Sequence, residues 1–119
     1  MPAHDPFVEY LLELLAGLPG VSARRMFGGY GLFRNGLMFG LVADETLYFK
    51  VDAESVGEFT ARGLGPFVYE KNGKPMPMSY HQAPGEALDD PDEMVAWAER
   101  AFAAAVRAQL SKAKTKAKK

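Results

Sequence analysis

The chain has 119 residues, enough for one domain, and its 48% hydrophobic and 24% charged residues are typical of a globular protein. It contains no cysteine, which excludes disulfides, thiolate metal sites and cysteine nucleophiles. No run approaches the ~18 apolar residues of a membrane span, and the first residues lack a secretory signal. We therefore expect a cytoplasmic protein with no membrane partner.

The net charge of −1 conceals an uneven distribution. Residues 1–110 hold nine basic and fifteen acidic residues, a net charge of −6, whereas residues 111–119 hold five lysines and no acid. We expect a domain over residues 1–110 and a lysine-rich tail over residues 111–119. The tail is either a solubilising end or a tether to nucleic acid. Its cations are Lys112, Lys114, Lys116, Lys118 and Lys119.

The N-terminal half predicts one helix followed by an antiparallel meander. Asp5-Pro6 is a good helix start, and Gly17, Pro19 and Gly20 end the helix. The leucines between them recur at helical spacing. Strands are then expected over residues 22–27, 30–34, 37–43 and 46–51. Asn35-Gly36 is typical of a type I′ hairpin turn, and Asp44-Glu45 makes a less standard tight turn.

The third of these strands is unusual because it is apolar on both faces. In a regular strand Leu37, Phe39 and Leu41 share one face, and Met38 and Val42 share the other. Such a strand should be central and covered on both sides. The cover is either helices of this chain or a second subunit, so a homodimer is one alternative.

The C-terminal half predicts a short helix over residues 53–62, a second hairpin and a long helix. The hairpin joins residues 66–71 to 74–82 through Asn72-Gly73, and Pro75 and Pro77 restrict its second strand to an edge or to pairing on one side. Asp90-Pro91 starts the last helix, which should run to about Leu110. Beyond it, alternating alanine and lysine are good helix formers, so the tail either extends the helix or is loose. We therefore expect an α+β fold in which an antiparallel meander and a second hairpin are flanked by N-terminal, short central and C-terminal helices.

No motif for catalysis, metal binding or cofactor binding is evident. His4 and His81 lack metal-ligand spacing, and Gly28-Gly29-Tyr30-Gly31 fits a bulge or a close backbone approach better than a phosphate cradle. The acidic cluster at residues 89–93 is explained by helix capping. An alternative is a small-ligand site or an uncharacterised active site at Ser79, Tyr80 and His81, because Ser79 and His81 should share one face of a strand.

Several segments together carry a family resemblance. These segments are RRMFGGYGLFRNGLMFGLVADETLYFKVD, PFVYEK, MSYHQAP and WAERAFAAA. They resemble the N-terminal domain of the TfoX/Sxy family of competence regulators, over about residues 5–108. The resemblance implies an α+β fold and no catalytic residues. Full regulators of this family carry a second domain and are thought to assist the cyclic-AMP receptor protein at competence promoters, whereas this chain resembles a stand-alone single-domain form.

Taken together, these features indicate a non-enzymatic regulatory or accessory protein. It would act through protein contacts, with a link to DNA as an alternative, in transcription or competence regulation. The candidate contact residues are Arg24, Arg25, Tyr48 and Lys50, chosen from the expected wetter positions of the meander. Because neighbours on a strand point to opposite faces, Arg24 and Arg25 cannot both serve one surface.

Overall fold

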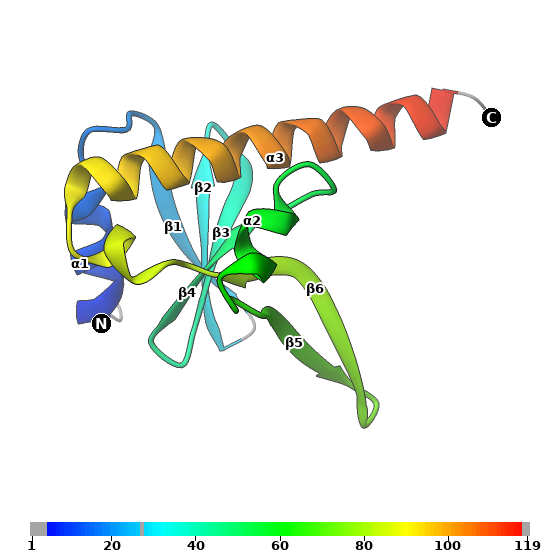
Figure 1. Cartoon of the computed structure of the whole chain (residues 1–119), viewed down its shortest axis with the longest axis horizontal. Helices are drawn as coiled ribbons and strands as arrows, with labels where there is room; N and C mark the ends of the chain where they lie inside the picture. Colours follow the sequence, from blue (N-terminus) through cyan, green and yellow to red (C-terminus); the bar gives the residue numbers. More distant parts are fainter. Residues whose placement is uncertain (1–4, 27, 118–119) are drawn as a thin grey trace.

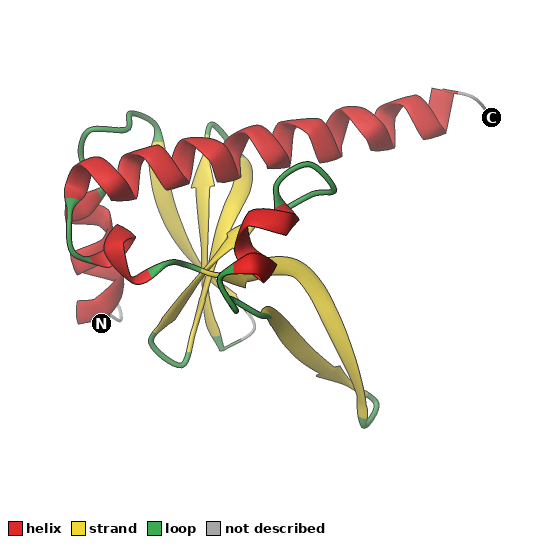
Figure 2. Cartoon of the chain, viewed as in Figure 1, coloured by secondary structure: helices red, strands yellow, loops and turns green. Residues whose placement is uncertain are grey.

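Six strands form a single antiparallel sheet with the order β1-β2-β3-β4-β6-β5. The computed structural model describes residues 5–26 and 28–117. The strands are β1 Val21–Met26, β2 Gly29–Arg34, β3 Leu37–Ala43, β4 Thr46–Lys50, β5 Pro66–Lys71 and β6 Lys74–Gln82. The helices are α1 Pro6–Leu14, α2 Val56–Ala61, the short 3-10 helix η1 Gly85–Leu88 and α3 Pro91–Ala117. Figures 1 and 2 show α3 crossing the sheet and the β5–β6 hairpin extending away from it. The predicted α+β class is confirmed.

Three of the hairpin turns, all within the described residues, have the backbone that a right-handed sheet twist favours. Both central residues have positive φ in each turn: 53° and 83° for Asn35-Gly36, 51° and 55° for Asp44-Glu45, and 54° and 76° for Asn72-Gly73. Positive φ at both positions defines the type I′ turn. The two Asn-Gly predictions are thus confirmed, and the unusual Asp44-Glu45 pair adopts the same geometry.

Aspartate caps start both long helices, as predicted. Asp5 Oδ1 accepts from the amide of Phe7 at 2.9 Å, and Asp90 Oδ1 accepts from the amide of Asp92 at 3.0 Å. Of the two alternatives for the chain beyond Leu110, the structure shows the extended helix, because α3 continues to Ala117 over 27 residues. Alanine and lysine are good helix formers, so the start of the tail prolongs the helix.

A β-bulge changes the expected face pattern of β3. Leu32 pairs with Gly40, but Phe33 pairs with Met38, so Phe39 is an extra residue in its strand. Because of this shift Phe39 and Val42 both belong to the buried core, although a regular strand would place them on opposite faces. Met38 is released to the other face of the sheet.

The two faces of β3 are covered by different parts of the same chain. On one face lie α3, which packs on β3 and β4, and α1. On the other face, Phe67, Tyr69 and Met78 of the β5–β6 hairpin curl towards β3 and enclose a groove with it. The cover predicted for the doubly apolar strand is therefore supplied within the chain, and on the hairpin side it is incomplete.

The prolines of β6 shape this hairpin. Strand β4 pairs only with the end of β6, through Tyr80 to Gln82, whereas Pro75 and Pro77 pair with β5. The expectation that the proline-bearing segment pairs on one side is confirmed. Strand β6 as a whole lies between β4 and β5, so β5 is the edge of the sheet.

A candidate binding groove on the open face of the sheet

We call the sheet face opposite α1 and α3 the open face. Its main feature is a groove of about 170 Å³ between the meander and the β5–β6 hairpin. The lining is almost wholly apolar. It consists of Met26, Gly29, Met38, Leu41, Val42, Ala43, Phe67, Tyr69, Met78 and Tyr80. Methionine side chains are flexible and polarisable, so a surface rich in them adapts to apolar groups of different shapes.

A second, more polar cavity of about 190 Å³ adjoins the groove. Met38 and Tyr80 line both spaces, so the two are neighbours along the sheet. The second cavity lies between the sheet and the C-terminal part of α3. Its lining consists of Leu37, Met38, Lys50, Tyr80, Ala105, Ala108, Gln109 and Lys112. The apolar groove therefore has beside it a more polar cavity that two lysines line.

Lys50 stands at the junction of the two spaces. Its Nζ donates to Ser79 Oγ at 2.6 Å and lies 5.2 Å from the centre of the Tyr80 ring. Burial, and next the charge of Lys112, lower the pKa of Lys50, while Asp52 acts in the opposite sense. Within the described residues no carboxylate forms an ion pair with Lys50.

Tyr80 is buried, and its burial raises the pKa of the phenol to about 12. The hydroxyl is therefore protonated at neutral pH. A neutral phenol can donate one hydrogen bond and accept others, which suits it to the boundary between an apolar and a polar space.

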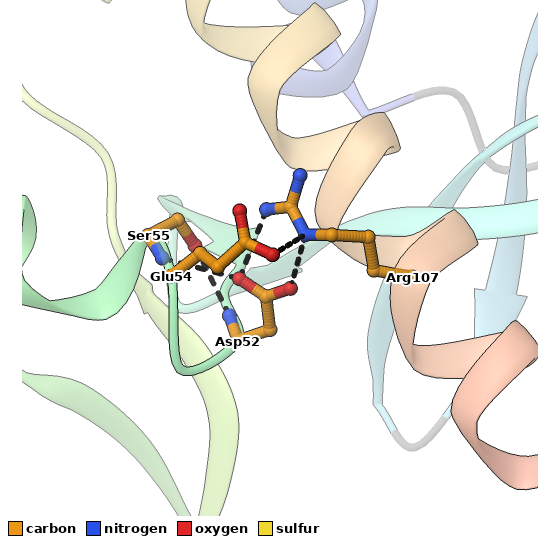
Figure 3. A network of polar contacts seen from close by, with 4 residues as sticks. All are labelled: Asp52, Glu54, Ser55 and Arg107. Atoms are coloured by element: carbon orange, nitrogen blue, oxygen red, sulfur yellow. Dashed lines mark hydrogen bonds and ion pairs between the residues drawn. The ribbon is translucent and has the colours of Figure 1, made fainter.

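An ion-pair cluster holds α3 over this end of the sheet (Figure 3). Arg107 Nε lies 2.5 Å from Asp52 Oδ2, and its Nη2 lies 3.0 Å from Oδ1, which is a bidentate pair. Asp52 Oδ1 also accepts from the amide of Ser55 at 3.1 Å, and Glu54 lies 3.5 Å from Arg107. These contacts, first of all the hydrogen bond from Arg107, lower the pKa of Asp52 to about 2. Because Asp52 follows β4 and Arg107 precedes Lys112, the cluster helps bring Lys112 near Lys50.

The four predicted contact residues do not form one patch. Tyr48 packs edge-to-face on Phe67 at 5.2 Å, and Lys50 lines the polar cavity, so both adjoin the groove. Arg24 is exposed on the open face, where its guanidinium lies 4.6 Å from the Phe33 ring. Two strands separate β1 from β4, which corresponds to about 14 Å. Arg25, the next residue on β1, points to the opposite face of the sheet.

The candidate residues on β6 have separate partners. His81 is buried, its ring contacts Phe59, and its Nδ1 lies 2.8 Å from the carbonyl oxygen of Leu64. Ser79 is exposed and bonded to Lys50. Of the three residues predicted for this strand, only Tyr80 lines the groove. Over residues 5–26 and 28–117 the structure contains no group of three His, Cys, Asp or Glu side chains that could hold a metal ion.

The tail lysines are only partly described. Lys112 is exposed and lines the polar cavity, and the backbone of Lys114 and Lys116 belongs to α3. Lys118 and Lys119 lie outside the described residues. Among the helices that the structure does describe, none has the length and apolar character needed to cross a membrane.

The groove itself was not predicted, although two signals pointed to it. One was the absence of alternation in residues 37–43, and the other was the apolar face shared by Met76, Met78 and Tyr80. Sequence alone could not show that the two apolar surfaces meet. In the fold, Met78 and Tyr80 line one groove together with Met38, Leu41 and Val42 of β3.

The fold and the groove define a small α+β domain whose helices cover one face of the sheet and whose other face is open. The sequence of the TfoX N-terminal domain family matches residues 13–105, which is most of the chain. The chain therefore belongs to the TfoX N-terminal domain family, as its sequence resemblance indicated. No curated protein matches the chain.

Proposed function

We propose that this protein is a non-enzymatic regulatory or accessory protein that acts in the cytoplasm by binding a partner protein in transcription or competence regulation. Membership of the TfoX N-terminal domain family supports the regulatory role. The observation that carries the binding role is the open face, where exposed apolar side chains share one face of the sheet with the exposed cation Arg24.

The β5–β6 hairpin is the proposed contact element. Val68, Tyr69 and Met76 are 49%, 39% and 48% exposed, and Figure 1 shows the hairpin projecting from the rest of the domain. Tyrosine and methionine are enriched in protein interfaces, and a cluster of exposed apolar residues marks an interaction site more often than a single one does. Arg24 lies on the same open face and adds a cation for an acidic partner surface.

Binding to the purified cyclic-AMP receptor protein, with cyclic AMP and a competence promoter fragment present, tests this proposal. We expect binding by the full chain, and at least a tenfold loss of affinity in the double variant Val68→Ser, Met76→Ser. Leu110→Ser is the matched control, because Leu110 is 60% exposed on α3, away from the hairpin. The absence of binding, or an equal loss in the Leu110 variant, would contradict the proposal.

The lysine-rich tail allows a separate prediction about nucleic acid. If all five lysines contact phosphates, the logarithm of DNA affinity should fall with the logarithm of salt concentration at a slope of roughly −4 to −5. Removal of residues 111–119 should flatten that slope by the same amount. Fluorescence anisotropy at several salt concentrations measures it, and an unchanged slope would rule out the tether. A chain with the five lysines changed to glutamine separates the loss of charge from the loss of chain length.

A second candidate function is the binding of a small ligand at Tyr80. The groove that Tyr80 lines is the specific observation in its favour.

A further inference from the structure

We propose that the groove and the adjoining polar cavity form one binding site for a small amphipathic anion, with an apolar body on the methionines and a carboxylate or phosphate head at Lys50 and Lys112. The apolar part of the site shares Tyr69 with the hairpin surface to which we assign partner binding, but the head-group part at Lys50 and Lys112 lies apart from that surface. It adds a ligand to a protein whose proposed role is regulatory.

The apolar part of the site is the space between β3 and the hairpin. Met26, Met38 and Met78 supply flexible walls, and Phe67 and Tyr69 supply rigid ones. A cavity of roughly 150 Å³ with apolar walls accommodates a benzene molecule. The groove, at about 170 Å³, is therefore large enough for about six to eight non-hydrogen atoms of an apolar group.

The charged part of the site favours an anionic head group over a neutral or a cationic one. Lys50 and Lys112 line the same cavity, and the two charges act on each other, as the effect of Lys112 on the pKa of Lys50 shows. The carboxylate of Asp52 acts to raise the pKa of Lys50, but it is already held by the bidentate pair with Arg107. An anion between the two lysines would relieve their repulsion and form charge-assisted hydrogen bonds.

The connection between the two parts restricts the ligand to one that has both features. Tyr80 and Met38 line both spaces, and Lys50 Nζ lies over the Tyr80 ring. A ligand with its head group at Lys50 and its chain beside Tyr80 and Met38 would contact both spaces. A purely apolar ligand would leave the lysines unpaired, and a small ion such as acetate would leave the groove unfilled.

Isothermal titration calorimetry on the full chain tests the proposal with octanoate, octyl phosphate, octanol and acetate as probes. We expect octanoate or octyl phosphate to bind at least tenfold more tightly than octanol, and acetate not to bind measurably. The comparison of octanoate with octyl phosphate identifies the preferred head group. If neither anion binds more tightly than octanol, the proposal is wrong.

Two pairs of variants locate the site. Lys50→Met keeps an apolar stem but removes the charge, and should weaken binding of the anion about tenfold while changing octanol binding less than about twofold. Lys74→Met, at the exposed turn of the hairpin, is its control. Met78→Ser should weaken binding of both the anion and octanol about fivefold or more, whereas Leu110→Ser, at an exposed position of α3 that lines neither space, should leave both unchanged.

Lys112→Met provides a second test of the charge, because this exposed residue of α3 can be replaced without disturbing the core. We expect a loss of anion affinity of about threefold to tenfold. Equal anion affinity in the Lys50, Lys112 and Lys74 variants would overturn the assignment of the head-group site. These measurements need no partner protein, so their failure is distinguishable from failure of the proposed function.

Discussion

Replacing Gly29 with alanine should destabilise the fold by about 3 kcal/mol, the largest effect that we expect from a single methyl group in this chain. A Cβ atom at this position would lie 2.1 Å from the backbone oxygen of Val42. That contact is with the backbone of a central strand, so no side-chain rotation relieves it. Urea unfolding followed by circular dichroism measures the change.

Gly57→Ala is the matched control for this substitution. Gly57 lies in α2, and a Cβ atom there meets nothing within 4 Å. Alanine is the better helix former, so this variant should be more stable than the natural chain by about 0.5 to 1 kcal/mol. If the Gly29 variant is as stable as the natural chain, β2 and β3 can move apart at this point without loss of stability, and the close approach of Gly29 to Val42 is not required by the fold.

Replacing Asp52 with asparagine should lower the free energy of unfolding at pH 7 by about 1 to 2 kcal/mol. The change removes the charge from the bidentate pair with Arg107 but keeps the shape of the side chain. The full shift from 3.8 to about 2 corresponds to a larger value, which we reduce because Arg107 is 36% exposed and solvent screens the pair. Thermal and urea unfolding of both chains measure the difference.

The same pair gives the pH dependence of stability a definite sign. The folded pKa of Asp52 lies below its ordinary value, so the unfolded chain binds more protons in the window between them. The contribution of Asp52 is complete above about pH 5 and is lost as the pH falls from about 4 through 2. In the asparagine variant this part of the acid dependence should be absent.

The exposed pair of Arg100 and Glu58 is the control for Asp52. Its closest nitrogen and oxygen lie 3.0 Å apart, but both side chains are about half exposed, at 57% and 49%. Glu58→Gln should therefore leave stability unchanged within error. If the Asp52 and Glu58 variants behave alike at every pH, the buried pair has no special role in holding α3.

Local sequence signals predicted the elements well because each one acts over a few residues. Asp5 and Asp90 cap helices through side-chain contacts with amides two residues away, and the Asn-Gly turns depend only on their own φ angles. The sequence left open whether the last helix stops near Leu110 or extends into the tail, because alanine and lysine favour a helix but no residue there marks its end. The short helix η1 was not predicted either.

Features that depend on distant contacts could not be predicted. The bulge at Phe39 changes which side chains of β3 face the helices, and no residue type in this strand predicts the bulge. Asp52 and Arg107 are 55 positions apart, so their pairing requires the fold. Of the candidate contact residues, Tyr48 and Lys50 lie beside the cavities, whereas Arg25 lies on the opposite face of the sheet, and their role in partner contact stays a prediction.

The ladder between β4 and β6 is short, so we expect the β5–β6 hairpin to open locally more readily than the meander. Three residue pairs, from Tyr48↔Gln82 to Lys50↔Tyr80, join the two strands, and one backbone hydrogen bond flanks them at each end, from Val51 to Ser79 and from Ala83 to Leu47. Amide hydrogens of β5 should consequently exchange with solvent by local opening, long before those of β3, which open only with the whole molecule. The β3 side of the groove is thus rigid and the hairpin side is flexible. A molecule bound between them would therefore also fix the orientation of the hairpin relative to the meander.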